Sequence, residues 1–395
     1  MTISMNELEK MRREWVEVTR KNGFRDGITD LLAHQYSKKT HFIFELLQNA
    51  EDAGASEVEF RVESEQLVFS HNGDRLFTDE NVESITSIGR STKQADYTQI
   101  GKHGIGFKAV FAYTHTPRIH SGDKHFEIED VVVPRLLTGD EVPADMGRGE
   151  TRIVLPFDSQ EIPESHRFRE LVPASSARAD ISGAMRQLSV RTLLFLRNIK
   201  KIRWTLSEGA CGTYLRQPKP HADKPGLRHV ILTDRNKPEA PETWAVFEGK
   251  TQVSDNGENH ECTVEVAFLI RGGRVVQAQS TELVVYFPTE KKTELGFLIQ
   301  GPFQTTKARD NIAQDSKANQ QLIEAVAQLV ADSLEDLRDS DLLDAFSYLA
   351  LPIRVQDFPE NSFFRVVYDK VRDALKTKPL LPADGGVVSD NYPVR

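Results

Sequence analysis

The residues best suited to chemistry lie together on one short stretch, residues 41–53, whose pattern predicts a helix. Within it, Glu45, Asn49 and Asp52 are spaced i, i+4 and i+7, so two carboxylates and one amide share a helix face. Mg²⁺ accepts one amide oxygen when waters and phosphate oxygens complete its shell, and a nearby carboxylate can deprotonate an attacking water. The stretch therefore predicts a magnesium–nucleotide site; a surface helix with solvated acids is the alternative.

A glycine-rich segment forms the second group. It consists of Gly101, Lys102, His103, Gly104, Ile105, Gly106 and Phe107. Three glycines ahead of a helical stretch leave backbone N–H groups open toward an anion, which suits phosphate binding, and a flexible loop is the alternative. No Gly-Lys-Ser/Thr follows, so the segment is not a Walker A loop. No strand leads directly into it, as a dinucleotide-binding fingerprint requires.

A third group lies between two predicted helices and contains Ser91, Thr92 and Lys93. Two hydroxyl groups and an amine suit a lid over phosphates, which would hinge on Gly89 and Gly101. A surface loop with solvated polar groups is the alternative.

The elements that must hold these groups are those of an α+β protein. Short strands are predicted at 58–62, 67–70, 126–128, 151–155 and 199–204, and helices at 78–87 and 181–195. After residue 207 strand-like runs recur, at 229–233, 243–247, 262–270, 283–287 and 297–299, and a long amphipathic helix follows at about 316–338. We therefore predict a first domain over residues 1–207, a second α+β domain over 208–340, and a helical segment over 341–395 that begins further sequence.

Composition narrows the class of protein. No apolar run approaches the length of a membrane span, and the charged N-terminus lacks the features of a signal peptide. The two cysteines, Cys211 and Cys262, are far apart, which excludes a disulfide framework and favours a cytoplasmic location. A net charge of −9 gives no sign of a nucleic-acid partner.

The order of the motifs resembles a known superfamily. The Glu-x-x-x-Asn helix, the turn at His71, the hydroxyl-rich stretch, the glycine-rich segment and the strand at Thr151 follow the four-motif order of the GHKL, or Bergerat-fold, ATPases. Residues 85–93 and 100–111 look most like the sacsin-type ATP-binding domain, whose sequence motifs are similar to those of the ninety-kilodalton heat-shock chaperone. The resemblance covers residues 28–205 well and 301–311 more weakly. It implies a two-layer Bergerat sandwich, followed by a transducer-like domain.

The resemblance also implies roles for single residues. Glu45 would be the general base, Asn49 the Mg²⁺ ligand and Asp52 a supporting carboxylate. The nucleotide phosphates would be bound by the following residues: Ser91, Thr92, Lys93, Gly101, Lys102, His103, Gly104, Ile105, Gly106 and Phe107. Gly73 would let the backbone approach the adenine, and Thr151 would bond near it.

One departure concerns the adenine pocket. The family has Asp-x-Gly-x-Gly, whose Asp accepts a hydrogen bond from the adenine amino group; here His71 and Arg75 replace the Asp and the second Gly. A neutral imidazole nitrogen could still accept that bond, and Asn72 is an alternative reader of the base.

The resemblance implies Mg²⁺-dependent ATP binding and slow hydrolysis that drive closure of a lid and of the second domain. Lys307 and Arg309 compete for the γ-phosphate in a loop of that domain. The implied partners are ATP and ADP, an unidentified client protein and a second copy bound in a nucleotide-dependent dimer. Two alternatives stay open: a non-hydrolysing nucleotide sensor or scaffold, and a DNA-associated clamp like MutL or MORC proteins.

Overall fold

The computed structural model describes residues 4–21, 39–87, 106–147, 149–255, 257–306, 311–383 and 386–388. The chain is a mixed α+β protein that divides into two compact units. The first unit comprises Met1–Leu215 with Asp234–Asn236, and the second comprises Arg216–Thr233 with Lys237–Arg395. The domain boundaries expected near residues 207 and 340 stay predictions, and the residues after 340 lie in the second unit.

The first unit is built on a mostly antiparallel sheet with the strand order β8-β7-β1-β2-β6-β3-β4-β5, in which only the β1–β7 pair is parallel. The strands are β1 (Glu57–Val62), β2 (Gln66–His71), β3 (Arg118–Ser121), β4 (Lys124–Glu129), β5 (Val133–Leu136), β6 (Thr151–Pro156), β7 (Lys201–Leu206) and β8 (Cys211–Pro220), of which residues 211–215 belong to this unit. Apolar and polar residues alternate along β1, so that Val58, Phe60 and Val62 are buried on one face of the strand and their polar neighbours lie on the other.

The helices of the first unit are α1 (Met5–Lys21), α3 (Phe42–Asp52), α4 (Asp79–Ile85) and α5 (Ala174–Gln187), with 3₁₀ turns η1 (Lys39–His41), η2 (Gly106–Ala112), η3 (Gly139–Glu141), η4 (Glu164–His166) and η5 (Val190–Leu193). Helix α3 follows from its apolar spacing, since Phe42, Leu46 and Ala50 are fully buried. It ends at Asp52, and Gly54, two residues further on, has a φ of 78° that is typical of a helix C-terminus.

One helix of this unit differs from the sequence prediction. The helix predicted at 181–195 is α5, which begins earlier, at Ala174, and a separate turn, η5. The interruption has a local cause, because Leu188 is extended and the Ser189 hydroxyl caps the following turn by accepting from the Arg191 N–H at 3.2 Å.

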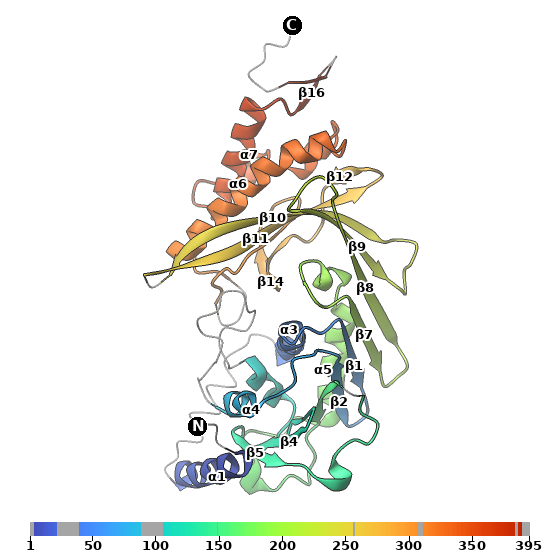
Figure 1. Ribbon diagram of the computed structural model, residues 1–395, viewed down its shortest axis with the longest axis vertical. Helices are drawn as coiled ribbons and strands as arrows, with labels where there is room; N and C mark the ends of the chain where they lie inside the picture. Colours follow the sequence, from blue (N-terminus) through green and yellow to red (C-terminus); the bar gives the residue numbers. More distant parts are fainter. Residues whose placement is uncertain are drawn as a thin grey trace. The chain divides into compact units, whose positions relative to one another are not determined.

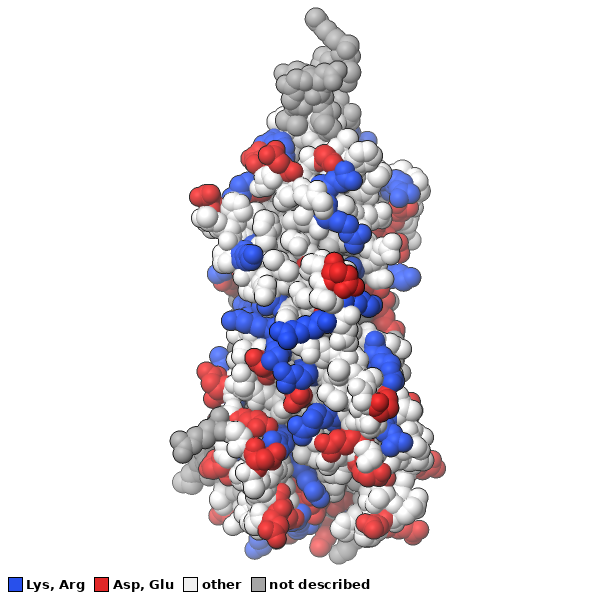
Figure 2. All heavy atoms as spheres, turned by 90° about the vertical axis from the view of Figure 1, so that its right-hand side faces the viewer, with Lys and Arg blue, Asp and Glu red and all other residues white. Residues whose placement is uncertain are grey.

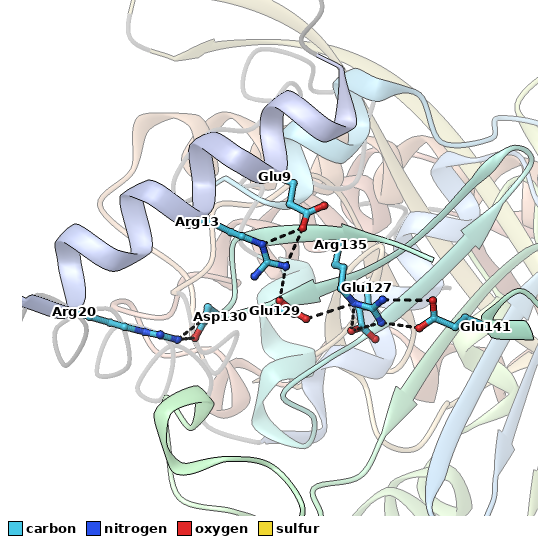
Figure 3. A network of polar contacts seen from close by, with 8 residues as sticks. All are labelled: Glu9, Arg13, Arg20, Glu127, Glu129, Asp130, Arg135 and Glu141. Carbon is cyan, nitrogen blue, oxygen red and sulfur yellow. Dashed lines mark hydrogen bonds and ion pairs between the residues drawn. The ribbon is translucent and has the colours of Figure 1, made fainter. Parts of the chain in front are cut away.

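Helix α1 is attached to the β4–β5 hairpin by charged side chains (Figure 3). The network consists of Glu9, Arg13, Arg20, Glu127, Glu129, Asp130, Arg135 and Glu141. Arg13 bridges its own helix and the hairpin, with 2.9 Å contacts to Glu9 and Glu129. Arg20 pairs with Asp130 at 2.8 Å. Together with the buried Leu8, these pairs fix α1 against the sheet.

The second unit contains a sheet with the strand order β14-β13-β15-β11-β10-β9, in which β12 pairs with β11 and only β13–β15 is parallel. Its strands are β9 (Leu227–Asp234), β10 (Glu242–Asp255), β11 (Glu258–Arg271), β12 (Arg274–Val276), β13 (Glu282–Val285), β14 (Phe287–Lys292) and β15 (Leu298–Gln300). Of the strand runs predicted after residue 207, 229–233, 243–247 and 262–270 lie within β9, β10 and β11, and 297–299 overlaps β15. The run predicted at 283–287 is divided between β13 and β14 by Tyr286, whose φ is 62°. Phe268 and Phe297 lie in the core of this unit, with their ring centroids 4.8 Å apart and their planes tilted by 43°.

Helix α6 (Lys317–Asp339) confirms the long amphipathic helix predicted at 316–338, and it packs on β10 and β11 (Figure 1). Helix α7 (Arg365–Thr377) packs on α6. The segment after 340 was predicted to be mostly helical, which is wrong. Besides α7, its described part consists of turns, including η6 (Ser347–Ala350) and η7 (Val355–Asp357), and of the hairpin β16 (Leu381–Ala383) with β17 (Gly386–Val388). Prolines at 352, 359, 379 and 382 interrupt the helical pattern.

Candidate functional site

The predicted polar face of α3 is present. Glu45, Asn49 and Asp52 are half-buried, while the opposite face of the helix fills the core. Among the described residues the Asn49 side chain has no hydrogen-bond partner, although a half-buried amide normally finds one. An unengaged amide between two carboxylates is a donor set that suits a hard cation held mainly by water and phosphate.

One end of this face is closed by the last glycine of the glycine-rich segment. Gly106 begins η2, which packs on α3. A β-carbon placed on residue 106 would lie 1.9 Å from Oε2 of Glu45, so any larger residue there would displace the carboxylate. The structure therefore brings together two residues that are 61 positions apart in the sequence and that were assigned to catalysis and to phosphate binding.

The other end of the face is closed by the turn that follows β2. A β-carbon on Gly73 would lie 2.8 Å from the Ala53 β-carbon, at the end of α3, and 3.0 Å from Nδ1 of His71. The Gly73 N–H donates to that Nδ1 at 3.1 Å. The turn thus holds the imidazole beside the C-terminal end of the helix that carries Glu45 and Asn49.

Three neighbouring strands bring His71 next to two hydroxyl groups. His71 of β2 pairs in register with Thr151 of β6, and Thr151 pairs with Ser121 of β3. Directly paired residues present their side chains on the same face of a sheet. The Ser121 and Thr151 hydroxyls lie 2.6 Å apart, and Ser121 accepts from the Phe77 N–H at 3.1 Å. Thr151 therefore lies beside His71, as the adenine-site prediction requires.

The protonation of His71 follows from this environment. Burial lowers the pKa of His71 to about 4, against a smaller opposing influence of the Glu150 carboxylate. The ring is therefore neutral at physiological pH. Because Nδ1 accepts from Gly73, the ring hydrogen lies on Nε2. The acceptor expected from the sequence is thus already engaged, and the remaining nitrogen is a donor.

Asn72 has a structural role. Its Oδ1 accepts from the Ser56 and Glu57 backbone N–H groups, both at 2.9 Å, and its Nδ2 donates to the Ser56 hydroxyl. Both lone pairs of Oδ1 are used, so Asn72 cannot accept an amino hydrogen from a base. This corrects its assignment as an alternative reader.

Arg75, the second departure from the family pattern, is bound to the end of α3. Its guanidinium donates to the Asp52 carbonyl at 3.0 Å and its backbone N–H to the Ala53 carbonyl at 3.2 Å. A cation at these terminal carbonyls stabilises the C-terminal end of a helix.

Two charged residues that the sequence did not single out are buried near the site. Glu51 accepts from the backbone N–H groups of residues 197, 198 and 199 at 2.7, 2.8 and 2.9 Å. Lys108, two residues after Gly106, donates to the Val131 carbonyl, and burial lowers its pKa to about 7. Its amine therefore faces the interior. In the sequence, the burial of Glu51 and Lys108 is indicated only by a charged residue that stands within an apolar helical pattern.

The remaining predicted site residues lie outside the described residues. They are Ser91, Thr92, Lys93, Gly101, Lys102, His103, Gly104, Ile105, Lys307 and Arg309. Phe107, by contrast, is described and is buried in η2. Within the described ranges no group of three or more His, Cys, Asp or Glu could hold a metal ion, and no helix is long and apolar enough to cross a membrane.

The two ends of the loop that carries residues 307–310 are described, and one buried side chain of α6 joins them. The Asn319 Oδ1 accepts from the Gln304 N–H at 2.7 Å, and its Nδ2 donates to the Gln304 and Ala313 carbonyls at 2.8 and 2.9 Å. Closer to the tip, the Thr306 N–H donates to the Asn311 carbonyl at 2.9 Å. The start and end of the loop are therefore fixed to each other and to α6.

Residues 24–140, which include α3 and η2, match the family model of the Sacsin domain. Protein NO VEIN of Arabidopsis thaliana is 26% identical over 367 residues, which represent 85% of this chain and 12% of that protein. Sacsin of Homo sapiens is 34% identical over 116 residues, 25% of this chain and 2% of sacsin. The chain thus spans a small part of the length of these relatives.

Among solved structures, the B-subunit of the DNA gyrase from Myxococcus xanthus has a TM-score of 0.34 and 13% identity, over 68% of this chain and 70% of that one. A likeness at this level supports no argument about fold or mechanism. The range that is similar to the Sacsin domain, residues 24–140, contains Glu45, His71 and Gly106.

Proposed function

We propose that this chain binds Mg²⁺-ATP along the polar face of α3 and hydrolyses it slowly. One observation carries the proposal: a glycine closes each end of that face, Gly106 at Glu45 and Gly73 at Ala53. Glu45 and Ala53 are just over two helical turns apart, roughly 12 Å along the axis. A base at one end and a terminal phosphate at the other would fit that length.

In this proposal each described residue has one task. His71 and Thr151 contact the nucleotide base, and Gly73 lets the turn after β2 pack closely on Ala53 and His71. Mg²⁺ would be held by the Asn49 amide oxygen, with Asp52 orienting bound waters, and would neutralise phosphate charge. Glu45 accepts the proton of the attacking water as general base.

The glycine-rich segment and Lys93 would bind the phosphates. The similarity of residues 24–140 to the Sacsin domain supports the proposal, because that range includes the α3 face and both closing glycines. The same proposal includes closure of a lid and of the second unit, driven by Lys307 or Arg309 at the γ-phosphate. It also includes a nucleotide-dependent dimer and a client protein. The roles of the residues in 88–105 and 307–310 are taken from the sequence resemblance.

The decisive experiment separates binding from hydrolysis. Glu45→Gln preserves the shape of the side chain and removes the base, so phosphate release should fall roughly 10²–10⁴-fold while Mg²⁺-ATP affinity stays near that of the parent. Glu65→Gln, an exposed acid in the β1–β2 turn, is the matched control and should leave both unchanged. Undiminished release in Glu45→Gln would contradict the assignment of the base.

Two other outcomes point to the alternatives. ATP binding with no release by the parent protein would favour a nucleotide sensor. A DNA-associated clamp gains no support from the net charge of −9, and acidic and basic side chains lie side by side over the lower part of the face drawn in Figure 2.

A further inference from the structure

The base end of the site contains a hydrogen-bond donor where the sequence resemblance leads one to expect an acceptor. A backbone N–H can only donate, so the 3.1 Å contact from Gly73 requires a lone pair on Nδ1 of His71. A neutral ring with a lone pair on Nδ1 carries its hydrogen on Nε2. In the part of the chain that the structure describes, Nε2 has no hydrogen-bond partner.

The tautomer is fixed by the fold. Residue 73 is packed against the end of α3, and His71 is only 6% exposed in its register position opposite Thr151. Rotating the ring to turn Nδ1 toward a ligand would remove the acceptor of the Gly73 N–H, and an unpaired buried N–H is costly. The nitrogen left for a ligand is therefore Nε2, with its hydrogen.

This arrangement has a consequence for the choice of base. An aspartate at position 71 could only accept, and it would select a base with an amino group. A donor at the same place is repelled by the amino hydrogens of a 6-aminopurine, but it pairs with the oxygen of a 6-oxopurine. The neighbouring hydroxyls of Thr151 and Ser121 can act as donor or acceptor and impose no preference of their own.

We propose that His71 reads the base by donating a hydrogen bond from Nε2, and that the site accepts 6-oxopurine nucleoside triphosphates at least as well as ATP. The inference rests on the proposed function, because it assigns the base to the His71–Thr151 end of the same site. It changes the expected substrate class from ATP alone to purine nucleoside triphosphates that present an acceptor at position 6.

The test compares two nucleotides that differ in this edge of the base. ATP and inosine triphosphate are titrated with Mg²⁺ into the parent chain, His71→Asp and the control His166→Asp, which changes an exposed histidine. The parent and the control should bind inosine triphosphate as tightly as ATP or more tightly. His71→Asp should shift the ratio of the two dissociation constants toward ATP by roughly 10-fold or more, because an unpaired buried polar group costs about that much affinity.

Each outcome decides between the ideas. If the parent prefers ATP by roughly 10-fold and His71→Asp leaves that ratio unchanged, the donor inference fails while nucleotide binding stands. If neither nucleotide binds, the proposed function fails as well. Should His71→Asp not fold, proton–nitrogen correlation spectra of the parent decide the tautomer directly. A hydrogen on Nδ1 in those spectra would overturn the inference, and one on Nε2 would support it.

Discussion

The carboxylate of Glu45 occupies the space in which a side chain on residue 106 would begin. The distance from Oε2 to a β-carbon at that residue would be 1.9 Å, shorter than any real contact of such an atom. The proposed base and the end of the glycine-rich segment are therefore coupled sterically, and a change in one has to move the other.

Gly106→Ala tests this coupling. The methyl group should push the Glu45 carboxylate aside and lower phosphate release roughly 10²-fold or more, with little loss of stability, because φ at residue 106 is outside the left-handed region. Steady-state phosphate release and thermal unfolding measure the two effects. Gly183→Ala is the control: a β-carbon there meets nothing within 4 Å, and release should not change.

Asn49→Ala tests the metal ligand. Loss of the amide oxygen should weaken ATP binding when Mg²⁺ is present and have much less effect in EDTA, because the side chain is proposed to contact only the ion. Calorimetric titrations under both conditions make the comparison. Asn72→Ala should show no such dependence on Mg²⁺, since its amide serves Ser56 and Glu57. Equal losses in Mg²⁺ and EDTA would make Asn49 a structural residue.

The buried His71 predicts a pH dependence of stability. Its pKa is about 4 in the folded chain and about 6.5 in an unfolded one. Between these values the unfolded chain binds a proton that the folded chain does not, so stability falls as the pH drops below 6.5 and continues to fall to about 4. The slope for one proton is at most about 1.4 kcal/mol per pH unit.

Denaturant unfolding of the parent and of His71→Gln, at several pH values between 7 and 4, measures this contribution. The variant should lose stability less steeply with acid, although His120, whose pKa burial also lowers to about 4, will keep part of the slope. Identical slopes would show that His71 titrates normally. ATP affinity, by contrast, should be flat between pH 6 and 8, because the ring is already neutral there.

Asn319→Ala tests how the loop of residues 307–310 is held. The change leaves the Gln304 N–H and two carbonyl groups without their buried partner, which should cost roughly 1–3 kcal/mol of stability. Hydrogen exchange at residues 304 and 313 should accelerate selectively. Gln320→Ala, next to it but exposed, should change neither stability nor exchange. Uniform acceleration over the whole unit would indicate global destabilisation instead.

Lys307→Ala and Arg309→Ala, made separately, test the loop itself. The cation that contacts the γ-phosphate should matter most in the transition state, so its loss should lower turnover roughly 10²–10³-fold with little change in ADP affinity. Phosphate release and ADP titration give both values. Normal turnover in both variants would remove the second unit from the hydrolysis mechanism.

The sequence predicted the elements best where one periodic pattern determined them. The spacing of Phe42, Leu46 and Ala50 was enough to place α3 and, with it, the common face of Glu45 and Asn49. The contact of Glu45 with Gly106 could not be predicted, because it depends on how η2 packs against α3, and local spacing contains no information about that packing.

Predictions based on a single side chain were less successful. Asn72 has the right chemistry for a base reader, but backbone N–H groups of Ser56 and Glu57, brought near by the β1–β2 pairing, use its acceptor. Glu51 and Asn319 show the reverse case, in which an ordinary polar residue becomes a structural centre. Both outcomes follow from tertiary hydrogen bonding, which composition and periodicity do not encode.

The carboxylate of Glu51 gives α3 a mechanical property. Its two oxygens accept hydrogen bonds from three successive backbone N–H groups of the segment that leads into β7. These bonds hold the helix firmly against that end of the sheet. Sliding or rotating α3 would break all three bonds at once and leave a buried charge unpaired. The helix therefore serves as the fixed reference of the site. If a bound nucleotide changes the conformation of the site, the segments around α3 should move and α3 itself should stay in place.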